Sequence, residues 1–156
     1  MFKIRKQIRN IYAISAFSSF QIAGASWVAL LAMRGFSLVQ IGFAECLFHV
    51  TSLLFEIPSG VISDVFGRKK TMILSQCFFV ISAFLMMIAE STVSVYIALM
   101  LAALGYNFSS GTREALAYDS LKKAGKEEEY DKYASTEMMI YRIGNASAML
   151  CAGLAL

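Results

Sequence analysis

Hydrophobic residues make up 58 % of the 156-residue chain and charged residues only 16 %, whereas an ordinary soluble domain has about 45–50 % and about 25 %. The net charge is +3, and the basic residues lie at the ends of apolar segments. This distribution favours lipid headgroups over nucleic acid as the partner. Cys46, Cys77 and Cys151 each lie alone within an apolar block, so we expect no metal site, no disulfide framework and no cofactor.

Five apolar blocks in chain order are long enough to cross a bilayer, since about 20 helical residues cover about 30 Å of hydrocarbon. The first block follows four basic residues, but a secretory signal would be shorter and would not precede further spans. The sequence therefore predicts an all-α membrane protein, a bundle of transmembrane helices. The predicted spans are residues 11–33, 38–63, 71–89, 94–113 and 136–156.

The connections between these spans alternate in basic content. Eleven of the fourteen Lys and Arg residues fall in the amino terminus, the 64–70 loop and the 115–135 loop. The positive-inside rule predicts that these three segments are cytoplasmic in the cell membrane. We expect the charged segment 119–132 to form a solvated interfacial helix.

The first and fifth spans carry small residues at a spacing of four, which allows helix backbones to approach closely. We expect these stripes to pack helices together rather than to line a substrate groove. They are Ser15–Ser19–Ala23 and Gly144–Ala148–Ala152.

The second span carries three ionisable residues, Glu45, His49 and Glu56, and each costs roughly 2.5–3.5 kcal/mol at membrane depth on insertion scales. At about 100° per residue, His49 lies about 40° and Glu56 about 20° around the helix from Glu45. Lipid cannot cover this stripe. It is either a buried structural network, with Arg142 of the fifth span as a partner, or a cavity lining that binds protons or a cationic solute. Glu137 is interpreted as interfacial, and Arg142 lies deeper in its span.

The connection between the second and third spans reads Gly60-Val-Ile-Ser-Asp64-Val-Phe-Gly67-Arg68-Lys69-Lys70. We predict a tight turn in which Gly60 and Gly67 permit close backbone approach and Asp64 stands among three cations. A phosphate-binding loop is excluded, because the spacing differs from G-x-x-x-x-G-K-[ST] and no strand precedes it.

At these residues the sequence resembles the major facilitator superfamily (MFS) of secondary transporters, whose loop signature reads G-x-x-x-D-x-x-G-R-[KR]-[KR]. Companion strings are Glu56-Ile-Pro58-Ser-Gly60 and the segment 111–121, in which Arg113 is similar to an arginine common in the fourth span of the family. Every fixed position of the signature is met, by Gly60, Asp64, Gly67, Arg68, Lys69 and Lys70.

The resemblance implies a fold of twelve helices in two halves built from inverted three-helix repeats. Residues 1–156 would be the first five helices of an incomplete amino-terminal half, unable to transport alone, with the remaining helices as partners. The loop would act as a conformational latch. We expect alternating-access transport of a small solute, coupled to protons. Export is slightly preferred because an acidic stripe suits protons and cations, although the fifth span lacks the Pro of drug/proton antiporters.

Two other classes of membrane protein fit the sequence less well. A multi-pass receptor or assembly subunit would not need an Asp among cations at a hairpin turn. An intramembrane enzyme would need a nucleophile or a metal-binding set, and the chain has one His and no G-x-S-x-G string. We therefore expect no enzymatic activity.

Overall fold

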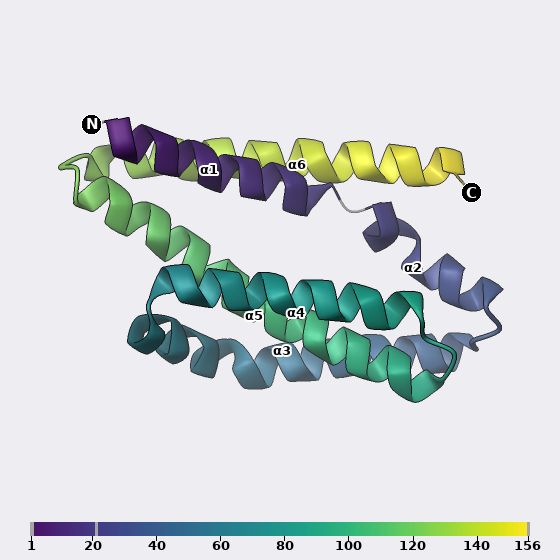
Figure 1. The fold of residues 1–156 in the computed structure, drawn as a ribbon. Helices are drawn as coiled ribbons and strands as arrows, with labels where there is room; N and C mark the ends of the chain where they lie inside the picture. Colours follow the sequence, from purple (N-terminus) through teal and green to yellow (C-terminus); the bar gives the residue numbers. More distant parts are fainter. Residues whose placement is uncertain (1, 21, 156) are drawn as a thin grey trace. The chain divides into compact units, whose positions relative to one another are not determined.

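The computed structural model describes the backbone of residues 2–20 and 22–155 and the side chains of residues 5–20 and 26–152. All regular structure in this part of the chain is helical (Figure 1), which confirms the all-α prediction. The elements are α1 (Phe2–Ser19), α2 (Ile22–Met33), α3 (Leu38–Phe66), α4 (Arg68–Met87), α5 (Thr92–Lys122), the short 3-10 helix η1 (Glu127–Glu129) and α6 (Tyr130–Ala155).

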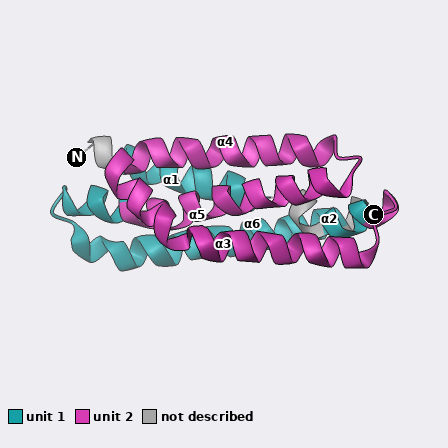
Figure 2. Ribbon diagram, turned by 90° about the horizontal axis from the view of Figure 1, so that it is seen from below, with its two compact units in different colours: residues 1–31, 116–156 teal, residues 32–115 magenta. Residues whose placement is uncertain are grey.

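The chain forms two compact units, coloured separately in Figure 2. Unit 1 consists of residues 1–31 and 116–156, so it contains α1, most of α2, the end of α5, η1 and α6. Unit 2 consists of residues 32–115 and contains α3, α4 and most of α5.

Unit 2 begins with a well-defined helix start. Ser37 caps α3: its hydroxyl accepts from the Gln40 amide at 3.3 Å, and its own amide donates to Gln40 Oε1 at 2.9 Å. This reciprocal capping box satisfies two amides that a helix start leaves without partners. Local sequence therefore determines where α3 begins, independently of its packing against other helices.

Helices α4 and α5 pack closely in unit 2. The Ser82 hydroxyl donates to the Ala98 carbonyl at 2.7 Å, and the rings of Phe78 and Phe108 stack with centroids 5.7 Å apart. A Cβ added to Gly105 would lie 3.2 Å from the Phe79 ring. A small residue at position 105 therefore lets the two backbones approach, as expected for helix pairs in membranes.

In unit 1, α1 lies along α6 (Figure 1). Ile11, Ala117, Leu121 and Tyr133 form a buried cluster. The Tyr133 ring stacks on Tyr12 with centroids 5.3 Å apart. This cluster joins α1 to α6 and to the last turns of α5, three segments far apart in the sequence.

The predicted packing role of the small-residue stripes is confirmed in unit 1. A Cβ added to Gly144 would overlap Ser19 Oγ and lie 3.0 Å from Ser19 Cβ, so α1 and α6 touch at this point. Ser15, Ser19, Ala148 and Ala152 are all buried. The side chain of Ala23 lies outside the described residues.

Three helices among the described residues are long and apolar enough to cross a membrane: α3, α4 and α5. The block predicted as one first span, 11–33, is instead divided between α1 and α2. Ser19 is the last residue of α1, and its hydroxyl donates to the Ala16 carbonyl at 3.0 Å. Phe20 is not helical, and Gln21 lies outside the described residues.

The fifth predicted span lies within α6, apart from Leu156, which is outside the described residues. Helix α6 is not among the three strongly apolar helices, because Asp131, Lys132, Glu137 and Arg142 lower its mean hydropathy. The limits of all five spans in the bilayer stay predictions.

The interfacial helix predicted for 119–132 is wrong. Helix α5 continues to Lys122 and ends in a turn at Gly125, whose φ of +66° favours glycine. The Gly125 amide donates to the Lys122 carbonyl at 2.9 Å and the Lys126 amide donates to Leu121 at 3.0 Å, the two bonds of a Schellman cap. The charges of this segment are largely exposed, as predicted.

Candidate functional site

The loop motif forms a turn of one residue between α3 and α4. Gly67 has φ +90° and ψ 134° and is the C-cap of α3 and the N-cap of α4. Its amide donates to the Ser63 carbonyl at 3.1 Å, and its own carbonyl accepts from the Lys70 amide at 3.0 Å. Residues with side chains rarely adopt this φ, which explains why the motif has a glycine at position 67.

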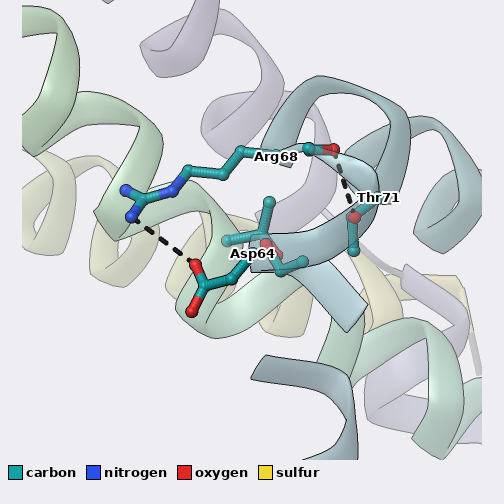
Figure 3. Close-up of polar contacts among 6 residues, drawn as sticks. Asp64, Arg68 and Thr71 are labelled. Atoms are coloured by element: carbon teal, nitrogen blue, oxygen red, sulfur yellow. Dashed lines mark hydrogen bonds and ion pairs between the residues drawn. The ribbon is translucent and has the colours of Figure 1, made fainter. Parts of the chain in front are cut away.

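Asp64 and Arg68 meet across this turn. Arg68 Nη2 lies 3.8 Å from Asp64 Oδ1 (Figure 3). The Asp64 side chain is 74 % exposed and that of Arg68 is 26 % exposed, so the carboxylate keeps access to a further partner. An exposed pair of this kind contributes about 0–1 kcal/mol, which is too little to explain the motif by stability.

The first turn of α4 is electrostatically unfavourable for a helix. It holds Arg68, Lys69 and Lys70, no acidic residue, and no side-chain cap from Gly67. Helix amino termini carry about half a positive charge and favour anions. Three cations there weaken the helix start, and the nearby Asp64 carboxylate offsets part of that cost.

Gly60 does not take part in the turn. It lies within α3, and a Cβ added there would meet no atom within 4 Å. The close backbone approach predicted at Gly60 and Gly67 is therefore absent from the described residues, because a Cβ added to Gly67 would also meet no atom within 4 Å. The turn requires glycine at position 67 for its φ instead.

The ionisable stripe lies on α3, one of the three described helices that are long and apolar enough to span a membrane. His49 Nε2 lies 3.3 Å from Glu45 Oε1. The side chain of His49 is 70 % exposed and that of Glu45 is 47 % exposed, and Glu56 is exposed as well. Within unit 2 the stripe is therefore not enclosed as a buried network.

A seam of hydrogen bonds between α3 and α5 runs beside this stripe. Asn107 Nδ2 donates to the Ser52 carbonyl at 2.6 Å, and the Ser52 hydroxyl donates to Asn107 Oδ1 at 2.8 Å. Near the turn, the Thr112 hydroxyl donates to Ser63 Oγ at 2.8 Å. Ser52 lies only about 20° around α3 from Glu45, so the stripe borders the line along which α5 packs.

The two arginine candidates occupy different surroundings. Arg113 lies on α5, half-buried, and its Nη2 donates to Ser109 Oγ at 2.8 Å. Arg142 lies on α6 in unit 1 and is exposed.

Two residues of interest were missed from the sequence. Glu137, interpreted as interfacial, is half-buried and accepts a hydrogen bond of 2.7 Å from the buried Ser15 hydroxyl of α1. Asn107 is 9 % exposed and joins α5 to α3. Asn107 stands as an amide within an apolar block, and that signal could have identified it.

The chain has matches among protein families and among curated proteins. The model of the Major Facilitator Superfamily matches residues 11–156. An uncharacterized MFS-type transporter YxaM of Bacillus subtilis is 27 % identical over 88 residues, 56 % of this chain and 22 % of that protein. An uncharacterized transporter of Buchnera aphidicola is 32 % identical over 97 residues, 62 % of this chain and 24 % of that protein.

These matches define a multi-pass membrane protein of a transporter family rather than an enzyme. The chain belongs to the Major Facilitator Superfamily, which confirms the resemblance drawn from the loop motif. The alignments cover about a quarter of the length of the curated relatives. No solved structure matches this chain.

Proposed function

We propose that this protein moves a small solute across the cell membrane by alternating access coupled to protons, with export favoured over uptake. The observation that carries the proposal is the Glu45–His49 contact, 3.3 Å, on an exposed side of a membrane-length helix. Ionisable residues at membrane depth are costly and mark ion or solute pathways. Glu56 extends the same side of α3 toward the loop motif.

The orientation is part of the proposal, with the amino terminus and the α3–α4 turn in the cytoplasm. Cysteines at Leu38 and Glu90 should react with an impermeant thiol reagent added outside, and cysteines at Lys69 and Lys123 should not. All four native residues are exposed. The background lacks Cys46, Cys77 and Cys151, which are themselves exposed. Labelling at the opposite pair would reverse the topology.

The α3–α4 turn supports a latch that holds one of the two conformations. Asp64 keeps most of its surface exposed, and the first turn of α4 has cations without acidic residues. We propose that helices of the other half supply a helix amino terminus to Asp64 and acidic side chains to the cations. A carboxylate near a helix start gains about 0.3–2 kcal/mol, enough to change a two-state population severalfold.

The coupling is tested with the full-length transporter in liposomes under an imposed pH gradient, with a panel of solutes. Glu45→Gln and Glu56→Gln should lower proton-driven flux at least tenfold while leaving insertion intact. Glu90→Gln, an exposed carboxylate in the α4–α5 connection, is the matched control and should transport normally. Undiminished flux in both stripe variants across pH would withdraw the coupling role.

The latch is tested separately in the same preparation. Asp64→Asn should fold and insert yet transport much more slowly, with accessibility shifted toward the inward-facing state. Arg68→Ala should act in the same direction. Asp131→Asn, another exposed aspartate, is the control. Normal rates and unchanged accessibility in Asp64→Asn would leave the latch without support.

A further inference from the structure

Helix α1 has a packed side that fixes how it is rotated in unit 1. Ile11 is buried in the cluster that joins α1 to α5 and α6, and Ile8 packs against that cluster. On the same side, Gln7 Nε2 donates to Ser120 Oγ of α5 at 2.8 Å. The opposite side of α1 is therefore held away from the rest of unit 1.

This outward side carries three cations followed by apolar residues. Arg5, Lys6 and Arg9 are all exposed, and Lys6 lies about 100° and Arg9 about 40° around the helix from Arg5. Ala13 and Phe17 continue the same side about one and two turns beyond Arg9, and Phe17 is 84 % exposed. These five residues form the α1 face, which changes from cationic to apolar along the helix.

The cations of the α1 face are available to an anion. Within the described part of the chain, none of the three forms an ion pair. The hydrogen bond from Lys126 is the main cause that lowers the pKa of Glu129, and the charge of Arg5 contributes least to that shift. The first ten residues contain four basic residues and no acidic residue, so no carboxylate of this segment neutralises them.

We propose that the α1 face binds an anionic phospholipid, with the headgroup phosphate on Arg5, Lys6 and Arg9 and an acyl chain along Ala13 and Phe17. Guanidinium and ammonium groups bind phosphate through charge-assisted hydrogen bonds, and basic segments beside a membrane attract anionic lipids. A soluble anion would contact the cations alone, whereas the acyl chain of a lipid also covers the apolar end of the face. The inference does not depend on the solute or on its coupling to protons.

The test places a reporter on the α1 face. Ala13→Cys, in the full-length transporter without its native cysteines, is labelled with a fluorophore in phosphatidylcholine nanodiscs. Phosphatidylglycerol with brominated acyl chains should quench this fluorophore at a severalfold lower mole fraction than phosphatidylcholine with the same chains. Ile97→Cys on α5 is the matched control, because Ile97 is exposed and residues 71–112 contain no Lys or Arg. Both lipids should quench equally at position 97.

Removal of the cations tests which side chains hold the headgroup. Arg9→Gln should lower the preference for phosphatidylglycerol about fivefold, the contribution of one basic residue near an anionic membrane surface. Arg9→Lys keeps the charge and should keep the preference. The triple variant Arg5→Gln, Lys6→Gln and Arg9→Gln should quench equally with both lipids. If the triple variant does not insert, the comparison of Arg9→Gln with Arg9→Lys decides.

The remaining outcomes separate a lipid from other occupants of the face. Equal quenching by the two lipids at position 13, or a preference that survives removal of the cations, would overturn the site. Quenching by neither lipid would mean that protein covers the face, which also refutes the proposal. Glycerol phosphate in solution should not displace the lipid, and displacement would assign the cations to a soluble anion instead.

Discussion

Helices α1 and α6 of unit 1 and helices α3 and α5 of unit 2 use polar residues in opposite ways. In the first pair, Ser15 and Ser19 are buried, and the Glu137 carboxylate turns inward to accept from Ser15. In the second pair, hydrogen bonds form the seam, but Glu45 and His49 remain at its exposed edge. The charge that contributes to packing is drawn inward, whereas the charged pair on α3 is left exposed beside the packing line.

The largest expected effect tests the close contact between α1 and α6. Gly144→Ala should destabilise the full-length transporter by about 1–3 kcal/mol, because the added methyl overlaps Ser19 and overpacking costs about that much. Thermal unfolding in detergent measures this loss. Gly42→Ala on α3 is the control, since its Cβ would meet no atom within 4 Å. Equal stability of the two variants would remove the distinction between the helix pairs.

The second prediction weakens the seam between α3 and α5. Asn107→Ala removes two hydrogen bonds and should cost about 1–3 kcal/mol at about 0.5–1.5 kcal/mol each. Ser52→Ala removes only the hydroxyl bond, because the Ser52 carbonyl remains, and should cost roughly half as much. Chemical unfolding of both variants gives the comparison. A larger loss from Ser52→Ala would mean that the seam depends on the hydroxyl instead of the amide.

The third prediction concerns the inward carboxylate of unit 1. Ser15→Ala and Glu137→Gln should each destabilise the protein, and a double-mutant cycle should give a coupling energy of about 0.5–1.5 kcal/mol. Unfolding of the four proteins of the cycle measures it. A coupling near zero would make Glu137 a peripheral residue, as the sequence first indicated.

Much of this architecture follows from local sequence, and the exceptions have physical causes. Apolar length predicts α3, α4 and α5, and small-residue spacing predicts the contact at Gly144, because both signals are local. The division at Phe20 was not predictable from hydropathy, since it falls within an uncharged apolar block. The role of Glu137 depends on Ser15, 122 positions away, and single-helix periodicity carries no such information.

The candidate site was likewise predictable from the sequence only in part. The stripe could be predicted because Glu45, His49 and Glu56 share one helix, and the glycine turn because its spacing is local. The aromatic neighbour Tyr106 comes from α5, and its approach to Phe48 depends on how two helices pack. Sequence therefore indicated where charge lies on the helix, and packing supplied the aromatic neighbours of that charge.

The smallest effect lies in the α5–α6 connection, where charge serves neither a packed interface nor a solute. The hydrogen bond that the Lys126 ammonium donates to Glu129 lowers the pKa of this carboxyl. Desolvation opposes the shift, and the positive charges of Lys126, Lys132 and Arg5 add to it. A lowered folded-state pKa means that the contact stabilises the turn above the unfolded pKa of a glutamate. This stabilisation is lost as the pH falls through the lower folded-state value.

An NMR titration of the Glu129 carboxyl should therefore show its midpoint below that of a free glutamate. Lys126→Met should return the midpoint most of the way, and Lys132→Met should return it less, following the order of the causes. Amide protection factors in residues 123–129, which correct the exchange rates for their intrinsic dependence on pH, should fall on acidification in the wild type and vary less with pH in Lys126→Met. Because both charges are substantially exposed, added salt should reduce the difference. A midpoint unmoved by Lys126→Met would show that the ammonium does not hold the carboxylate, and that this connection is ordered by the Gly125 cap alone.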